Sequence, residues 1–152
     1  MKNPHRHLEA TVSAQLREPI LASVAIKSKG SVRAAIWGGA VGMLIASAVS
    51  SSRAGNAASY AKGQIPVPAN GYLCVTPTRL AIFEARMGLG KSKLGELILM
   101  TPRQNVAALT GNSKHLAWLP AELRLMDGRQ MEFVYHRAWR EDFGKVQAYF
   151  PQ

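Results

Sequence analysis

One long uncharged stretch constrains this chain more than any other feature. Residues Ala34–Ser52 read AAIWGGAVGMLIASAVSSS, and Arg33 and Arg53 bound the stretch on its two sides. As a helix it would be about 28 Å long, close to the roughly 30 Å of a bilayer's hydrocarbon core. It would have no polar face, and a helix that is apolar all round must be buried in protein or in lipid. A stripe of small residues, which includes Gly38-x-x-x-Gly42, would let a second backbone approach closely.

Three interpretations of this stretch compete. The first is a secretory signal, because Ala46-Ser47-Ala48 resembles a cleavage site, but the region before the apolar core would be about thirty residues long and would contain a strand. The second is a single transmembrane helix of marginal length, in which the alanine, glycine and serine content weakens insertion. The third is a helical insertion that packs on the domain, on a second copy of the chain, or on a membrane without crossing it.

The order of elements along the chain favours the third interpretation. Ile20–Lys27 alternates with a period of two, which predicts a half-buried strand. If this strand pairs with strands that follow residue 70, both ends of the apolar stretch must lie on one side of any bilayer. We therefore expect the stretch to contact a membrane or a partner without spanning. The expected contact residues are Ile36, Trp37, Gly38, Gly42, Leu44 and Ile45.

The net charge is large for a chain of this size: +10 over 152 residues. Such a charge points toward anionic partners, either a membrane surface or nucleic acid. Nucleic acid is the less favoured partner, because the basic residues are scattered over several elements and no recognition motif appears. The expected contacts with an anionic surface are Lys27, Lys29, Arg33, Arg86, Lys91 and Lys93.

Three of these cations lie in or beside a glycine-bounded basic loop, Met87–Gly95. The loop is not a phosphate-binding P-loop, because no Gly-Lys-Ser/Thr motif occurs at the right spacing before a helix. Two interpretations remain open. The loop is either a solvated hairpin tip, or a tip whose cations contact anionic headgroups at about 1 kcal/mol each.

Residues that could carry chemistry are few. The one cysteine, Cys74, excludes an internal disulfide, and its apolar surroundings predict a small core residue rather than a nucleophile. His5 and His7 lie in a polar start, Met1–His7, with no third metal ligand near, so we expect a loose terminus there. No catalytic set stands in motif context, so we expect no enzyme, no cofactor and no metal. The low cysteine content suits a reducing compartment, and we expect a cytoplasmic protein that associates with membrane.

The rest of the chain is predicted to be mainly β, with a helix at its end. Leu8–Leu16 reads as a short helix or a first strand, and Gly55–Asn70 reads as a flexible return linker. An apolar stripe of Trp139, Phe143, Val146 and Phe150 predicts the C-terminal helix. The later strands are predicted at Gly71–Thr76, Arg79–Arg86, Glu96–Met100, Asn105–Thr110, Ala121–Met126 and Gln130–Tyr135, with His115–Leu119 as an extended lead-in that ends at Pro120.

The run YLCVTPTRLAIFEAR, the loop GLGKSKLGELI and the run ELRLMDGRQMEFVYHR together resemble bacterial pleckstrin-homology-like domains. The resemblance implies a mainly β, antiparallel barrel or sandwich of about seven strands with a C-terminal α-helix. It places the domain at 19–150, after an N-terminal extension at 1–18, with an apolar helical insertion at 31–54 and a linker at 55–70. The insertion departs from the family pattern, so phosphoinositide recognition does not carry over.

Two functions follow from these features. The first is a non-enzymatic, membrane-peripheral interaction module that binds an anionic bilayer surface through the apolar insertion and the flanking basic residues. The alternative is a soluble protein-docking or self-association module, in which the Ala/Gly helix face packs against a partner or against a second copy in a homo-oligomer.

Overall fold

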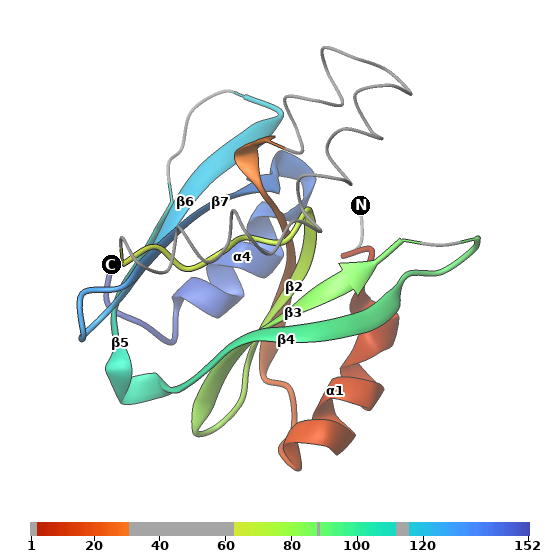
Figure 1. Cartoon of the computed structure of the whole chain (residues 1–152), viewed down its shortest axis with the longest axis horizontal. Helices are drawn as coiled ribbons and strands as arrows, with labels where there is room; N and C mark the ends of the chain where they lie inside the picture. Colours follow the sequence, from red (N-terminus) through yellow and green to blue (C-terminus); the bar gives the residue numbers. More distant parts are fainter. Residues whose placement is uncertain (1–2, 31–62, 88, 112–115) are drawn as a thin grey trace.

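The computed structural model describes residues 3–30, 63–87, 89–111 and 116–152 (Figure 1). These residues are mainly β, and their strands form a seven-stranded antiparallel sheet in the order β4-β3-β2-β1-β7-β6-β5. The apolar stretch Ala34–Ser52, with its expected contact residues and Arg33, lies outside the described residues. The strands are β1 (Ala22–Lys27), β2 (Asn70–Val75), β3 (Arg79–Arg86), β4 (Lys93–Pro102), β5 (Val106–Gly111), β6 (Trp118–Leu125) and β7 (Gln130–His136).

Strand β1 pairs along its whole length with β2, which follows the apolar stretch in sequence. Val24 lies opposite Leu73, and Lys27 lies opposite Asn70. The strand predicted at Ile20–Lys27 is therefore confirmed, and so is its pairing with a strand beyond residue 70. Because Lys27 and Asn70 are direct neighbours, the chain between them leaves the sheet and rejoins it at the same place.

The connections between strands gather at two ends of the sheet. At the first end β1 finishes opposite the start of β2, the β3–β4 hairpin turns, and the start of β6 lies close, because Lys27 Nζ is 5.4 Å from the centroid of the Trp118 ring. At the second end the β2–β3, β4–β5 and β6–β7 connections lie together, because the Arg103 N–H donates to the Thr78 carbonyl oxygen at 2.9 Å and the Met126 N–H donates to the Asn105 carbonyl oxygen at 2.7 Å. We call the first the Lys27 end and the second the Pro77 end.

The main core lies between the sheet and the C-terminal helix α4 (Arg140–Gln147), which follows the short 3-10 turn η3 (Arg137–Trp139). The apolar stripe predicted here is confirmed, although the regular helix is shorter than the stripe. Helix α4 packs on the sheet because its charged residues lie on its other side. The buried members of the stripe are Trp139, Phe143, Val146 and Phe150.

A second, smaller core covers the other face of β2 and β3. There the 3-10 turn η1 (Arg6–Leu8) leads into α1 (Glu9–Leu16), so the segment Leu8–Leu16 is helical rather than a strand. Helix α1 packs Val12 against Tyr72 and Phe83 of the sheet, and Figure 1 shows it on a different side from α4. Strands β2 and β3 are therefore covered on both faces.

The loose terminus expected for Met1–His7 is wrong from Asn3 onward. Asn3 is 6% exposed and His5 is 4% exposed. The Asn3 side-chain amide donates to Ser23 Oγ at 3.4 Å, and the Leu8 N–H donates to the His5 carbonyl oxygen at 2.9 Å. The segment is ordered because its polar side chains find partners on the folded sheet, which the sequence of the terminus does not reveal.

Two strands are longer than the sequence predicted. Strand β4 begins at Lys93 instead of Glu96, because its ladder with β3 continues past two irregularities in register. Strand β6 begins at Trp118 and runs through Pro120, where we predicted a break. The described pairing with β5 begins only at Ala121, so the missing N–H of Pro120 removes no ladder bond on that side.

Candidate functional site

The strand directions bring the expected anionic-surface residues to one end of the molecule. Lys27 ends β1 and Lys29 follows it, while Arg86 ends β3 and Lys93 begins β4. Lys91 lies between the last two, in the hairpin connection. All of these residues belong to the Lys27 end, from which the chain also departs toward the apolar stretch.

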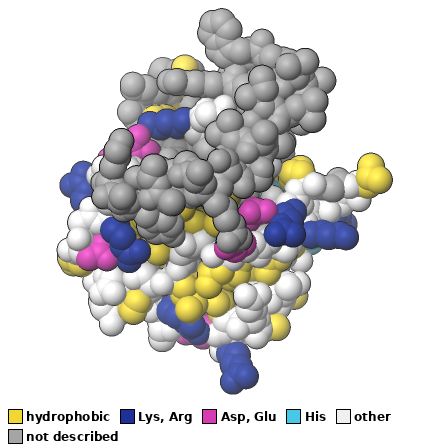
Figure 2. All heavy atoms as spheres, viewed as in Figure 1, with side chains coloured by type: hydrophobic (Ala, Val, Ile, Leu, Met, Phe, Trp, Pro, Cys, Tyr) yellow, Lys and Arg dark blue, Asp and Glu magenta, His cyan; other side chains and the backbone are white. Residues whose placement is uncertain are grey.

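The tip of the β3–β4 hairpin, residues 86–93, exposes apolar side chains that our sequence interpretation did not use. The hairpin projects from the sheet (Figure 1), with a hydrophobic side chain at its extremity and Lys and Arg side chains behind it (Figure 2). Met87 is 64% exposed and Leu89 is fully exposed. Gly90 has a φ of 93°, a backbone conformation that favours glycine in this turn. The sequence signal for this exposure was the run MGLG at residues 87–90, because glycines have no side chains against which Met87 and Leu89 could pack.

Two histidines of the amino-terminal segment hold the base of this tip. Nδ1 of His5 lies 2.7 Å from Ser92 Oγ, and Nε2 of His7 donates to the Ser92 carbonyl oxygen at 2.6 Å. Ser92 is buried by these contacts. Burial, together with the nearby His7 and Lys27, lowers the pKa of His5 to about 4. The tip is therefore positioned by residues far from it in sequence, and the sequence singled out the histidines without indicating their partner.

Two of the expected cations are paired with carboxylates. Lys29 Nζ lies 3.0 Å from Glu132 Oε2, and Arg86 Nε lies 3.1 Å from Glu84 Oε1. Exposed ion pairs of this kind contribute little to stability, about 0–1 kcal/mol, but each reduces the charge that the cation offers to a ligand. Lys29 and Arg86 are therefore the weaker candidates for contact with an anionic surface.

The other three cations have no carboxylate partner among the described residues. Lys27 is half-buried, with Nζ 5.4 Å from the centroid of the Trp118 ring, and burial lowers its pKa. Lys91 and Lys93 are exposed on the tip beside Met87 and Leu89. The strongest free positive charge of the candidate site therefore lies on the tip itself.

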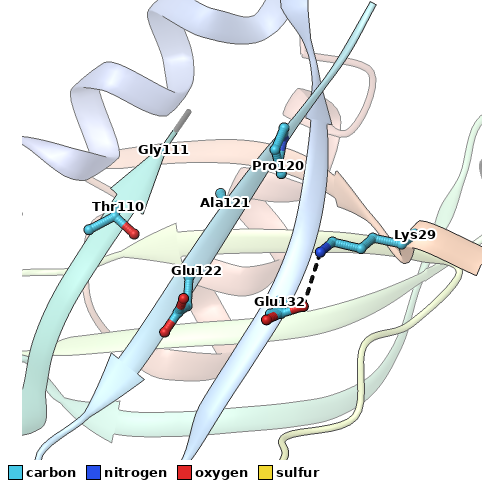
Figure 3. A pocket seen from close by; sticks show the side chains of 7 residues that line it. All are labelled: Lys29, Thr110, Gly111, Pro120, Ala121, Glu122 and Glu132. Atoms are coloured by element: carbon cyan, nitrogen blue, oxygen red, sulfur yellow. Dashed lines mark hydrogen bonds and ion pairs between the residues drawn. The ribbon is translucent and has the colours of Figure 1, made fainter. Parts of the chain in front are cut away.

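A shallow hollow of about 360 Å³ lies beside Lys29, along β5, β6 and β7 (Figure 3). Glu122 and Glu132 lie directly opposite each other there, and Arg124 Nη2 approaches Glu122 Oε1 at 2.8 Å while Lys29 holds Glu132. Two neutralised carboxylates do not make a metal site, and the described residues contain no group of three or more metal-binding side chains. Lys29, the cation that lines the hollow, is paired there with Glu132, so the hollow adds no unpaired positive charge to the candidate site.

The remaining residues singled out from the sequence have structural roles. Cys74 is fully buried in β2, and burial raises the pKa of its thiol to about 12, so its prediction as a core residue is confirmed. His136 accepts a hydrogen bond from the Ala138 N–H through Nδ1 at 3.0 Å and so begins η3. Neither residue contributes to the candidate site.

No helix among the described residues is both long enough and apolar enough to cross a bilayer. Comparison of the chain with protein-family models, with curated proteins and with solved structures finds no match.

Proposed function

We propose that the protein is a non-enzymatic, membrane-peripheral module whose Lys27 end binds an anionic bilayer surface. In this proposal Met87 and Leu89 enter the headgroup region, while Lys91 and Lys93 attract the surface. The proposal keeps the expectation from the sequence that the apolar stretch Ala34–Ser52 adds to the contact. The observation that carries the proposal is the β3–β4 tip, which exposes two large apolar side chains beside two cations that have no acidic partner in the described part of the chain.

The two kinds of contact have comparable magnitudes. Each lysine near an anionic surface contributes about 1 kcal/mol, and each buried Met or Leu side chain about 1.5–3 kcal/mol. Two of each give roughly 5–8 kcal/mol before the cost of association is subtracted. Neither pair is sufficient by itself, so we expect binding that requires anionic lipid and weakens as salt is added.

The pairing of β1 with β2 supports a peripheral contact over a single membrane crossing. Lys27 and Asn70 lie directly opposite each other in the sheet. A chain that crossed a bilayer once between these residues would leave them on opposite sides and break the β1–β2 ladder. The segment between them must therefore return to the side from which it left.

We also propose that the fold is pleckstrin-homology-like. The support is the number of antiparallel strands, together with a C-terminal helix that follows the last strand and covers the main core. The position of a tryptophan, Trp139, at the start of this helical region agrees with the resemblance noted in the sequence.

Vesicle co-sedimentation tests the proposed function. The purified chain would be mixed with vesicles of phosphatidylcholine alone, or of phosphatidylcholine with phosphatidylserine. We expect binding only to the second kind, and Met87→Glu should weaken it at least tenfold, because a charge replaces about 2 kcal/mol of apolar burial. Met126→Glu is a matched control. Met126 and Met87 are similarly exposed, at 67% and 64%, but Met126 lies at the Pro77 end.

A second pair of variants tests the electrostatic part. Lys93→Gln should weaken binding about fivefold, whereas Lys145→Gln on α4 removes the same charge away from the tip and should have a much smaller effect. Absence of binding to both vesicle types by the folded protein would overturn the proposal. If Met87→Glu and Met126→Glu weakened vesicle binding equally, the β3–β4 tip would not be the contact surface.

A further inference from the structure

The two edges of the sheet differ in how they are covered. At the β5 edge, the Leu109 N–H donates to the Pro151 carbonyl oxygen at 2.8 Å, and Gln147 Nε2 donates to the Leu109 carbonyl oxygen at 3.0 Å. At the β4 edge, no strand of the described chain pairs with the outer side. An uncovered edge presents unpaired N–H and C=O groups to which another extended chain can add.

The hydrogen-bond pattern shows which groups of β4 point outward. The Arg103 N–H donates to the Thr78 carbonyl oxygen at 2.9 Å, which makes this pair a hydrogen-bonded position of the β3–β4 ladder. Bonded and non-bonded pairs alternate along antiparallel strands. Thr101 and Leu99 therefore bond inward to β3, whereas the N–H and C=O of Met100 point to the free side. Pro102 also faces outward, where its lack of an N–H disturbs no bond to β3.

The usable part of this edge is short. Register irregularities interrupt the β3–β4 ladder between Ile82 and Phe83 and again between Phe83 and Ala85, and a bulged edge is a poor template for pairing. The regular part, from Leu99 to Pro102, adjoins exposed apolar side chains, of which Leu97 and Met100 are the largest. Figure 2 shows hydrophobic side chains gathered over β4.

A hollow of about 610 Å³ lies at the end of this regular segment, at the Pro77 end. Two cations line it, of which Arg79 is paired with Glu18 at 2.8 Å. The other is Arg103, whose Nη1 donates to the Pro77 carbonyl oxygen at 3.1 Å and whose guanidinium lies 4.9 Å from the centroid of the Tyr149 ring. These contacts fix the guanidinium, but no carboxylate of the described residues pairs with it. Glu18 is bonded to Arg79 and to Thr78.

We propose that the β4 edge binds an extended segment of a partner protein and that Arg103 binds an acidic side chain of that segment. The partner adds a strand beside Leu99–Pro102, with its main chain bonded to the N–H and C=O of Met100. Its Asp or Glu enters the hollow and pairs with Arg103, next to Tyr149. Main-chain bonds supply affinity and the acidic side chain supplies selectivity, as in other cases of strand addition. The proposal does not depend on membrane binding, because it concerns the opposite end of the sheet.

A display library of short random peptides, selected on the folded full chain, tests this proposal. We expect the enriched peptides to share an Asp or Glu, and synthetic copies with Asn or Gln there to bind at least roughly tenfold more weakly. Arg103→Gln should cause a similar loss. Arg129→Gln is the matched control, because Arg129 lies at the same end but is paired with Asp127 at 2.9 Å, outside the hollow.

A second pair of variants tests the edge itself. Met100→Pro removes the outward N–H while leaving the bonds to β3, and should abolish peptide binding. Met100→Leu keeps the N–H and should bind the same peptides nearly as well. Circular dichroism and thermal unfolding show whether each variant is folded.

Three outcomes would overturn the proposal. The first is no enrichment on the folded chain. The second is a set of binding peptides that is insensitive to Met100→Pro or to Arg103→Gln. The third is concentration-dependent self-association, seen by size-exclusion chromatography with light scattering, that Met100→Pro abolishes, because the occupant of the edge would then be a second copy of this chain.

Discussion

Lowering the pH from about 7.5 to about 5 is expected to release the amino-terminal segment from the β3–β4 tip. His5 is 4% exposed, and its pKa is lowered from 6.5 to about 4. The main cause is burial, and the nearby His7 and Lys27 add positive charge that further disfavours the imidazolium. Because the folded-state pKa lies below the unfolded one, the packed segment is fully stable above the ordinary pKa. That stability is lost as the pH falls through the interval between the two values.

The size of the effect follows from the two pKa values. Each pH unit inside the interval removes about 1.4 kcal/mol from the packed form. About pH 5 lies roughly 1.5 units below the ordinary pKa, so the packed segment loses about 2 kcal/mol, or roughly thirtyfold in its opening equilibrium. The effect is local, because His5 contacts the sheet through Ser92 of the tip and not through either core.

Amide hydrogen exchange measures this release directly. The Leu8 N–H, which donates to the His5 carbonyl oxygen, should exchange about thirtyfold faster at the lower pH after correction for the intrinsic rate. The Cys74 amide, in β2 between β1 and β3, is the internal control and should not change. In NMR the His5 imidazole should titrate near its lowered pKa of about 4. In the His5→Gln variant the corrected exchange rate of the Leu8 amide should depend much less on pH, whatever the effect of the substitution on the stability of the chain.

A His5 imidazole that titrates at its ordinary pKa while the segment remains packed would contradict this prediction. A corrected Leu8 exchange rate that is independent of pH in the wild-type chain would contradict it as well. Either result would mean that the hydrogen bond between His5 and Ser92 Oγ holds the charged imidazolium in the packed segment as well as it holds the neutral ring.

Three further predictions concern the fold. Gly111→Ala should destabilise the chain by about 1–3 kcal/mol in urea unfolding, because an added Cβ would lie 2.7 Å from Cε1 of Phe143. Cys74 should not react with a thiol reagent at about pH 8 in the native chain, and should react at once in denaturant, because burial raises its pKa to about 12. Glu18→Gln should lower the melting temperature near neutral pH, because hydrogen bonds from Thr78 and Arg79 hold the pKa of this carboxyl below its usual value and favour the ionised form. The wild-type and variant melting temperatures should converge in acid, where Glu18 is protonated.

The sequence predicted most strands because their signals are local. The Asp127-Gly128 turn and the alternation on either side of it specify the β6–β7 hairpin by themselves. The alternation of Ile20–Lys27 located β1, but it implied an exposed second face. Ser23 on that face is buried because α1 brings the Glu9 carboxylate to within 3.1 Å of its hydroxyl. That contact depends on where a separate helix packs, and no periodicity within the strand records it.

The candidate site was less predictable, for the same reason. The sequence identified Lys29 as a contact for an anionic surface, but its neutralisation by Glu132 joins residues 103 positions apart. Nor does a short basic loop indicate that Ser92 will be held by His5 and His7. What the sequence did contain was the composition of the tip, in which large apolar residues alternate with glycine.

The two proposed surfaces lie at opposite ends of the same strands, and this has a measurable consequence. Strand β3 begins at the Pro77 end, next to the hollow of Arg103, and reaches the tip after eight residues, or roughly 25 Å at about 3.3 Å per residue. At that separation, and with no shared partner, the effects of variants should add within about 0.5 kcal/mol. A chain with both Met87→Glu and Arg103→Gln should therefore lose vesicle binding and peptide binding by the same factors as the single variants. A Kd for the peptide that changes when vesicles are saturated would show coupling between the ends, and the sheet could not then be treated as a rigid spacer between two independent contacts.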